Sequence, residues 1–240
     1  MKNLFLLLSA TLLFISTACA QWGSEKVRGD GNLVTISRDV GSYEGVQLVG
    51  SLNVELISGN EGNIKIQAES NLQEYITTEV KNGKLRISTR EGFNLNPKDE
   101  ILIIVPVESI EEVSVTGSGD IWTKDQLKAS SMKVQVTGSG DLKLDLEVKD
   151  LKGMVTGSGD IELRGKSQNF ECTVTGSGDF EAYNLRAENV EARVSGSGDI
   201  MVYAGKTLKA SVSGSGDIVY KGNPKKQDFK TNGSGSVSSH

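Results

Sequence analysis

The tetrapeptide Gly-Ser-Gly-Asp occurs six times in the second half of this 240-residue chain, and no other feature restricts the fold as strongly. Successive copies are 18 to 21 residues apart, and an altered copy, Gly-Ser-Gly-Ser, begins at Gly233. Helical repeats have longer periods and need amphipathic helical stretches. Here a valine stands two residues before every copy and an apolar residue follows each aspartate, with alternation of period two on both sides. The pattern predicts a strand, a tight glycine corner and a second strand in each repeat.

The apolar residues of every repeat lie at the same offset from the same glycine corner. In an antiparallel meander the corners would alternate between the two ends of the strands, so equal offsets favour coils that wind in one direction. One repeat cannot bury its apolar face alone, whereas stacked repeats can. We therefore predict an all-β protein, a parallel β-helix with coils of about 19 residues and equivalent strands about 4.8 Å apart. An antiparallel β-sandwich is the alternative.

Glycine is expected at two positions of each corner for a steric reason. A sharp bend that is repeated in register needs backbone angles forbidden to residues with a Cβ, and closely stacked coils leave little room for side chains. The predicted structural corner residues are Gly117, Gly119, Gly138, Gly140, Gly157, Gly159, Gly176, Gly178, Gly196, Gly198, Gly214 and Gly216.

The chain divides into three predicted parts, namely a leader over residues 1–20, a less regular part over 30–110 and the regular coils over 111–236. In the middle part, the stretch Val49-Gly50-Ser51-Leu52-Asn53-Val54 resembles one corner with a residue missing and asparagine in place of aspartate. We expect residues 30–110 to form irregular coils that cap one end of the solenoid. A separate small β domain is the alternative.

The first 20 residues have the features of a bacterial export signal. Lys2 supplies positive charge, and the apolar run 4–15 is too short to span a membrane. Ala18 and Ala20 form a small-x-small cleavage site. In the competing interpretation, Ser16-Thr17-Ala18-Cys19 resembles a relaxed lipobox, and Cys19 would carry a lipid. Either interpretation predicts export to the periplasm, the outer membrane surface or the medium.

The composition of the chain argues against several classes of function. The net charge of −5 argues against nucleic acid or an anionic membrane as the main partner. The one histidine is His240, the last residue, so we expect neither a Ser-His-Asp or Cys-His pair nor a histidine metal site. Cys172 takes the place that Val134 and Ala192 hold in other coils, which predicts a small core residue rather than a nucleophile. We predict no catalytic residues, no metal centre and no required cofactor.

A predicted row of aspartates is the strongest candidate for a ligand or cation site. Stacked carboxylates about 5 Å apart would repel each other by about 0.8 kcal/mol per neighbour in water, so something must compensate. Each carboxylate could accept backbone hydrogen bonds, divalent cations could bridge the row, or the row could bind a ligand. Its members are Asp120, Asp141, Asp160, Asp179, Asp199 and Asp217.

The chain also resembles a known family. The stretch Gly45–Leu56, the segments Ala68–Leu72 and Thr78–Val80, and the following Gly-Ser-Gly-Asp repeats are similar to the auto-transporter adhesin "head GIN" domain family. The resemblance covers residues 30–225. It implies an exported protein with a right-handed β-helix like that of pectin lyases. It supplies no catalytic residues.

Three functional hypotheses follow. The first is an exported, non-enzymatic adhesin-like protein that binds a cell-surface partner or carbohydrate. The second is a polysaccharide lyase or hydrolase, which would need clustered acids and bases on one face. The third is a structural module that forms homo-oligomers through an outward strip containing Trp122, Met201 and Val219. Membrane association is expected only through a lipid on Cys19.

Overall fold

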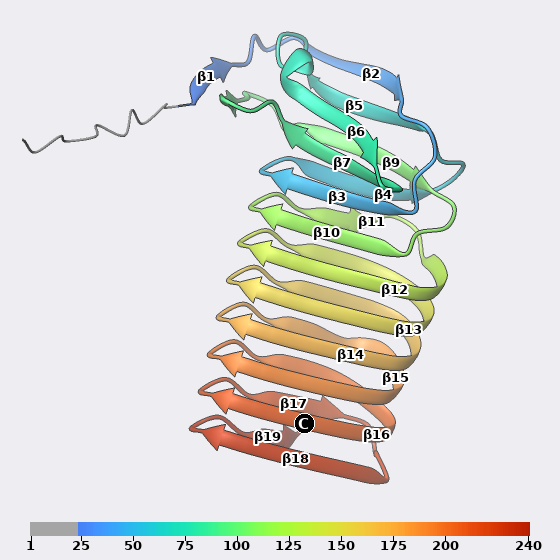
Figure 1. Ribbon diagram of the computed structural model, residues 1–240, viewed down its shortest axis with the longest axis vertical. Helices are drawn as coiled ribbons and strands as arrows, with labels where there is room; N and C mark the ends of the chain where they lie inside the picture. The colour runs from blue at the N-terminus through green and yellow to red at the C-terminus, as the bar shows by residue number, and fades with distance from the viewer. Residues whose placement is uncertain (1–23) are drawn as a thin grey trace, which may run out of the picture.

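In the computed structural model, which describes residues 24–240, the repeats form successive coils of a right-handed parallel β-solenoid (Figure 1). The predicted export signal and Cys19 lie outside the described residues. Within those residues, no helix is long and apolar enough to cross a membrane. The elements are β1 (Glu25–Arg28), β2 (Leu33–Asp39), β3 (Gly45–Gly50), β4 (Asn53–Ser58), β5 (Asn63–Glu69), the short 3-10 helix η1 (Gln73–Tyr75), β6 (Ile76–Lys81), β7 (Lys84–Thr89), β8 (Phe93–Asn96), β9 (Leu102–Val107), β10 (Glu112–Gly117), β11 (Ile121–Thr123), β12 (Leu127–Gly138), β13 (Leu142–Gly157), β14 (Ile161–Gly176), β15 (Phe180–Gly196), β16 (Ile200–Gly214), β17 (Ile218–Lys221), β18 (Lys226–Gly233) and β19 (Val237–Ser239).

Equivalent residues of successive coils pair in parallel, as the repeat predicts. Val136 lies beside Val155, which lies beside Val174, and the same row continues through β15 and β16. Each of β13 to β16 runs from one glycine corner, around the rounded opposite edge, to the next corner (Figure 1). The parallel β-helix is therefore confirmed, and the β-sandwich alternative is not favoured.

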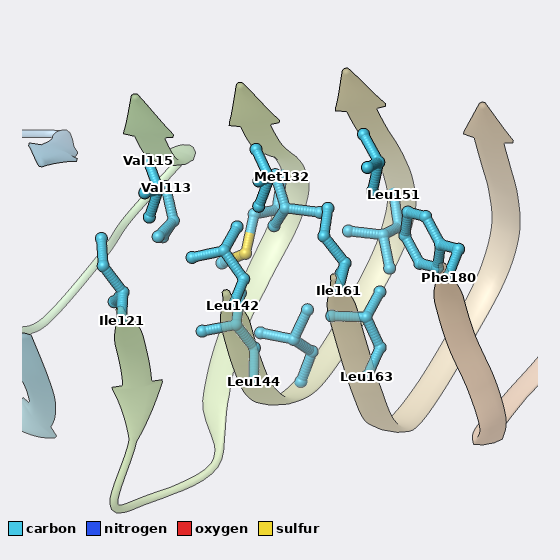
Figure 2. Close-up of a cluster of buried hydrophobic side chains, with 14 of the residues drawn as sticks. Val113, Val115, Ile121, Met132, Leu142, Leu144, Leu151, Ile161, Leu163 and Phe180 are labelled. Carbon is cyan, nitrogen blue, oxygen red and sulfur yellow. The ribbon is translucent and has the colours of Figure 1, made fainter. Parts of the chain in front are cut away.

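The core consists of rows of apolar side chains that point into the solenoid from both faces. Figure 2 shows Ile121, Leu142, Ile161 and Phe180 in one such row, and all four side chains are fully buried. The Phe180 ring packs at 5.5 Å from the ring of Phe170. It also fills the space opposite Gly153, because a Cβ on that glycine would lie 2.4 Å from Phe180 Cζ. The absence of a side chain in one coil thus makes room for a large ring from another.

Residues 30–110 contribute to the solenoid out of sequence order. The unit β3–β4 stacks directly on β10–β11, with Gly50 beside Gly117 and Val54 beside Ile121. On its other side β3 pairs with β7 and β4 pairs with β9, again in parallel. The coil that contains Gly50 therefore lies between the regular coils and segments that follow it in the chain.

Antiparallel strands cover this end of the solenoid. Strand β5 pairs with both β2 and β9, and β6 forms a hairpin with β7. The fully buried Glu69 ties two loops to this cover, since its carboxylate oxygens accept the backbone N–H groups of Gly31 (2.6 Å) and Lys98 (2.8 Å). A buried carboxylate needs such donors to offset the loss of water. From these pairings we propose that residues 30–110 cap this end of the solenoid.

Candidate functional site

The glycine corner joins neighbouring coils through backbone hydrogen bonds. In the coil at Gly157, the N–H groups of Ser158 and Gly159 both donate to the carbonyl oxygen of Gly138, at 2.8 and 3.0 Å. The corner glycine has a φ of +121°, in the region that favours residues without a Cβ. A Cβ at this position would lie 2.4 Å from the same carbonyl oxygen. The corner therefore leaves no space for any residue but glycine.

The six aspartates form one continuous row beside these corners. The Oδ1 atom of Asp141 accepts the backbone N–H of Asp160 at 2.9 Å, and Oδ1 of Asp160 accepts the N–H of Asp179 at 2.8 Å. The same bond joins every consecutive pair in the row, and Asp217 closes it by accepting the N–H and the hydroxyl of Ser236. Each carboxylate is thus held by the backbone of the following coil. Charge-assisted hydrogen bonds of this kind offset the repulsion between neighbouring carboxylates.

Two substitutions of Asp160 distinguish what its hydrogen bond contributes to stability from what its negative charge contributes. We expect Asp160→Ala to destabilise the protein by about 1–2 kcal/mol, because the N–H of Asp179 loses its acceptor. Asp160→Asn should cost less than about 0.5 kcal/mol, because the amide keeps an acceptor oxygen and relieves repulsion. Urea unfolding of both variants measures the difference. Equal damage from both would indicate that the negative charge itself is needed, as a bridging cation would require.

Cation binding along this row remains a prediction. Among residues 24–240, no three side chains of His, Cys, Asp or Glu are grouped closely enough to hold a metal ion. Hard cations such as Ca²⁺ bind six or more oxygen ligands. At this row, the ligands would have to include backbone carbonyls and water.

A groove lies on the opposite, rounded edge of the solenoid. It has a volume of about 710 Å³ and crosses five consecutive coils, from β12 to β16. Its floor follows the buried side chains of Leu151, Phe170 and Val190, which are only 2 to 3% exposed. Because adjacent residues of a strand point to opposite faces, the residues on either side of this floor point outward and form the two walls.

Side-chain amides form one wall of the groove. Asn169 Nδ2 donates to Asp150 Oδ1 at 2.6 Å, and Asn189 Nδ2 donates to Asn169 Oδ1 at 3.0 Å. The hydroxyl of Thr207 donates to Asn189 Oδ1, also at 3.0 Å. We call Asp150, Asn169, Asn189 and Thr207 the amide ladder. It presents polar groups that are already fixed in position, one per coil.

Ion pairs form the other wall. Lys152 pairs with Glu171 at 3.2 Å, and Lys209 pairs with Glu191 at 2.9 Å. The hydrogen bond from Lys209, helped by the positive charge of Arg193, keeps the pKa of Glu191 below its usual value despite partial desolvation. Glu191 is therefore ionised near neutral pH, and this wall carries fixed charges of both signs.

Comparison with known proteins identifies the family. The family described as "Putative auto-transporter adhesin, head GIN domain" matches residues 42–224. This chain belongs to that family. No curated protein matches the sequence.

Solved structures share the fold of this head GIN domain over almost the whole chain. A putative adhesin from Bacteroides fragilis has a TM-score of 0.83 at 24% identity, with 89% of this chain and 100% of that one covered. A protein from Parabacteroides distasonis described as a putative lipid binding protein has a TM-score of 0.76 at 27% identity, covering 90% and 100%. A putative adhesin from the same species has a TM-score of 0.74 at 22% identity, with the same coverage.

The sequence-based site prediction included the aspartate row of this head GIN domain but not the groove. The aspartates follow the glycine corners, whereas the groove lies at the rounded edge. These two edges of the ribbon are opposite each other (Figure 1), so the structure brings the six aspartates together with one another and not with the amide ladder. A signal for the ladder exists in the sequence, because each of its members stands six residues before the Thr or Ser that precedes a glycine corner. It was missed because the residue type at that offset varies from coil to coil.

The remaining candidates of the head GIN domain are placed as follows. Cys172 is fully buried, and burial, with a smaller effect from the Glu171 carboxylate, raises the pKa of its thiol. The outward row that begins at Trp122 continues through Lys143, Glu162 and Glu181 before it reaches Met201 and Val219. Three charged residues of this outward row therefore stand between Trp122 and the apolar pair Met201 and Val219, in the order that the sequence repeat predicts.

Proposed function

We propose that this head GIN domain protein is exported and acts at the cell surface or in the envelope as a non-enzymatic, adhesin-type binding protein. The leader over residues 1–20 supports export, and the adhesin description of the family supports binding. Whether the leader is cut behind Ala20 or Cys19 is acylated decides between a free and a membrane-anchored protein.

We propose the groove on the rounded edge as the binding surface and an extended carbohydrate as its ligand. The groove is the observation that carries this proposal, because it runs along the stack and crosses one coil about every 4.8 Å. A linear polymer can repeat the same contacts from coil to coil. The amide ladder offers hydrogen-bond groups to hydroxyls. Because these side chains already hold one another in position, they lose little conformational entropy when a ligand binds.

The arrangement of acids and bases favours binding over catalysis. A general acid must be protonated at the working pH and must not be committed to another partner. Glu171 and Glu191 are both ion-paired, and the pKa of Glu191 is lowered rather than raised. The groups in the groove are thus suited to recognise a ligand rather than to transfer protons.

Binding of the exported, purified protein to a panel of immobilised neutral and acidic polysaccharides tests this function. We expect binding to at least one of them, and about tenfold weaker binding by the Asn169→Ala/Asn189→Ala variant, which corresponds to about 1.4 kcal/mol. Glu181→Ala, on the other face of the solenoid, is the matched control and should bind normally. Thermal unfolding of each variant checks that the fold is intact.

Two outcomes would contradict the proposal. Binding only to phospholipid vesicles would favour the activity named for the Parabacteroides distasonis protein described as lipid binding. Release of reducing or unsaturated sugar ends from any polysaccharide would favour an enzyme instead.

A further inference from the structure

The strand edges are covered by other strands at one end of the solenoid and are open at the other. At the first end, antiparallel strands β2, β5 and β6 cover the stack. At the other end, β18 pairs with β16 and β19 pairs with β17, and within residues 24–240 no strand is in register with the second edge of β18. Strand β18 is the last strand on its face of the stack (Figure 1). All eight of its residues are exposed. Such an edge carries unpaired N–H and C=O groups and can template pairing with another strand.

The end coil also exposes part of the interior row. Phe229 stands in register with Ala210, which is 1% exposed, so its ring belongs to the row that forms the core. The ring is nevertheless 38% exposed, and it and Leu33 are the large apolar side chains exposed among residues 24–240. Its ring centroid lies 5.7 Å from that of Tyr220. A further coil would bury this ring, as each coil buries the row of the preceding one.

Symmetry limits how a second copy can supply that coil. A two-fold axis perpendicular to the sheet at β18 keeps the inward faces of both copies on the same side, so the Phe229 rings meet and the inward Gln227 of one copy lies opposite the inward Thr231 of the other. It makes β18 of one copy antiparallel to β18 of the other. A two-fold axis along the strand would instead place the inward face of one copy beside the outward face of the other, which would expose Phe229.

The charges on β18 select one register of this antiparallel pair. Centring it on Phe229 places Asp228 opposite Lys230 of the second copy, twice by symmetry, and overlaps residues 226–232 of both strands. Centring it on Asp228 or on Lys230 would bring like charges face to face, which destabilises a sheet. Within residues 24–240 neither Asp228 nor Lys230 takes part in an ion pair, so both are free to pair across such an interface.

We infer that this protein self-associates end to end, with β18 pairing antiparallel to β18 of a second copy around a two-fold axis at Phe229. The pair joins two solenoids into one longer stack and points their covered ends, β2, β5 and β6, in opposite directions. The amide ladders of both copies stay exposed, because the interface uses only the end coils. The contact is small, so the dimer is expected to form reversibly and to depend on concentration.

Sedimentation equilibrium over a concentration series tests the inference, on purified protein in which Cys19 is replaced by Ser so that no lipid can cause association. We expect a monomer–dimer equilibrium. Asp228→Lys and Lys230→Asp should each raise the dissociation constant about tenfold or more, because each places like charges opposite one another. The double variant Asp228→Lys/Lys230→Asp should restore association to near the starting value, since the swap recreates the pairs.

Matched controls keep the test decisive. Lys143→Glu and Glu162→Lys reverse an exposed ion pair on the side of the solenoid and should leave the dissociation constant unchanged. Phe229→Ser should weaken association by removing the shared core contact, while circular dichroism checks the fold. A protein that stays monomeric at every concentration, or a dimer that the single charge reversals do not weaken, would overturn the inference. Failure of the double swap to restore association would refute the proposed register.

Discussion

Replacing Gly157 by Ala is expected to lower the stability of the protein by about 4 kcal/mol. The residue has a φ of +121°, and forcing a side chain into such a region costs about 1–3 kcal/mol. The added Cβ would also lie 2.4 Å from the carbonyl oxygen of Gly138, which is backbone and cannot rotate away. Relief of this contact requires the two coils to separate locally, at a further cost of about 1–3 kcal/mol. The shift in the midpoint of urea unfolding measures the effect.

Gly50 provides the matched control for this substitution. It occupies the equivalent corner of the coil β3–β4 and has a similar φ of +112°, but no atom lies within 4 Å of a Cβ built there. Gly50→Ala should therefore show only the conformational strain, about 1–3 kcal/mol. The excess for Gly157→Ala reports the contact between stacked coils. Equal losses in the two variants would show that the corners are not packed against one another.

Truncation of Phe180 to Ala is expected to cost about 3–5 kcal/mol, because its ring is fully buried and leaves a cavity. The ring occupies the space that the missing side chain of Gly153 leaves, so Gly153→Ala should by itself cost about 1–3 kcal/mol through overpacking. In the Phe180→Ala background the same Gly153→Ala change should be neutral or stabilising, since the methyl group then enters the cavity. Urea unfolding of the four proteins gives the coupling energy.

We expect a coupling of at least about 1 kcal/mol between these two positions, as is usual for residues in contact. Val212→Ala in β16 serves as the comparison, because its cost should add to that of Gly153→Ala. Additive costs for Gly153 and Phe180 would contradict the packing in which a glycine of one coil accommodates the ring of another.

The regular coils could be predicted from the sequence because every coil has the same pattern of apolar residues around its glycine corner. Val136, Val155 and Val174 stand at equal offsets from their corners, and equal offsets become direct neighbours once the coils stack in parallel. The need to compensate the stacked aspartate charges followed from the same reasoning, and backbone hydrogen bonds were one of three solutions that the sequence left open. The identity of the donor, the N–H of the following aspartate, depends on the exact rise between coils and was not evident from the residues.

The covered end and the groove could not be predicted in this way. The stacking of β3–β4 between β10–β11 and β7–β9 joins segments that are far apart in the chain, and no local pattern encodes such an order. The groove arises where the chain bends around the rounded edge, so its walls depend on coil geometry rather than on a motif. In the sequence alone, Asn169 and Asn189 cannot be distinguished from ordinary polar surface residues.

A distance between two spin labels tests the central claim that the glycine corners of successive coils stack in register. In a protein with Cys19 replaced by Ser, Ser118→Cys and Ser215→Cys place labels on exposed corners that are five pairing steps apart, while Cys172 remains buried and unlabelled. At about 4.8 Å per coil, pulsed electron paramagnetic resonance should give a distance near 24 Å, broadened by the label arms. A distance of about 40 Å or more, or two separate distances from corners on opposite edges, would contradict the stacked solenoid.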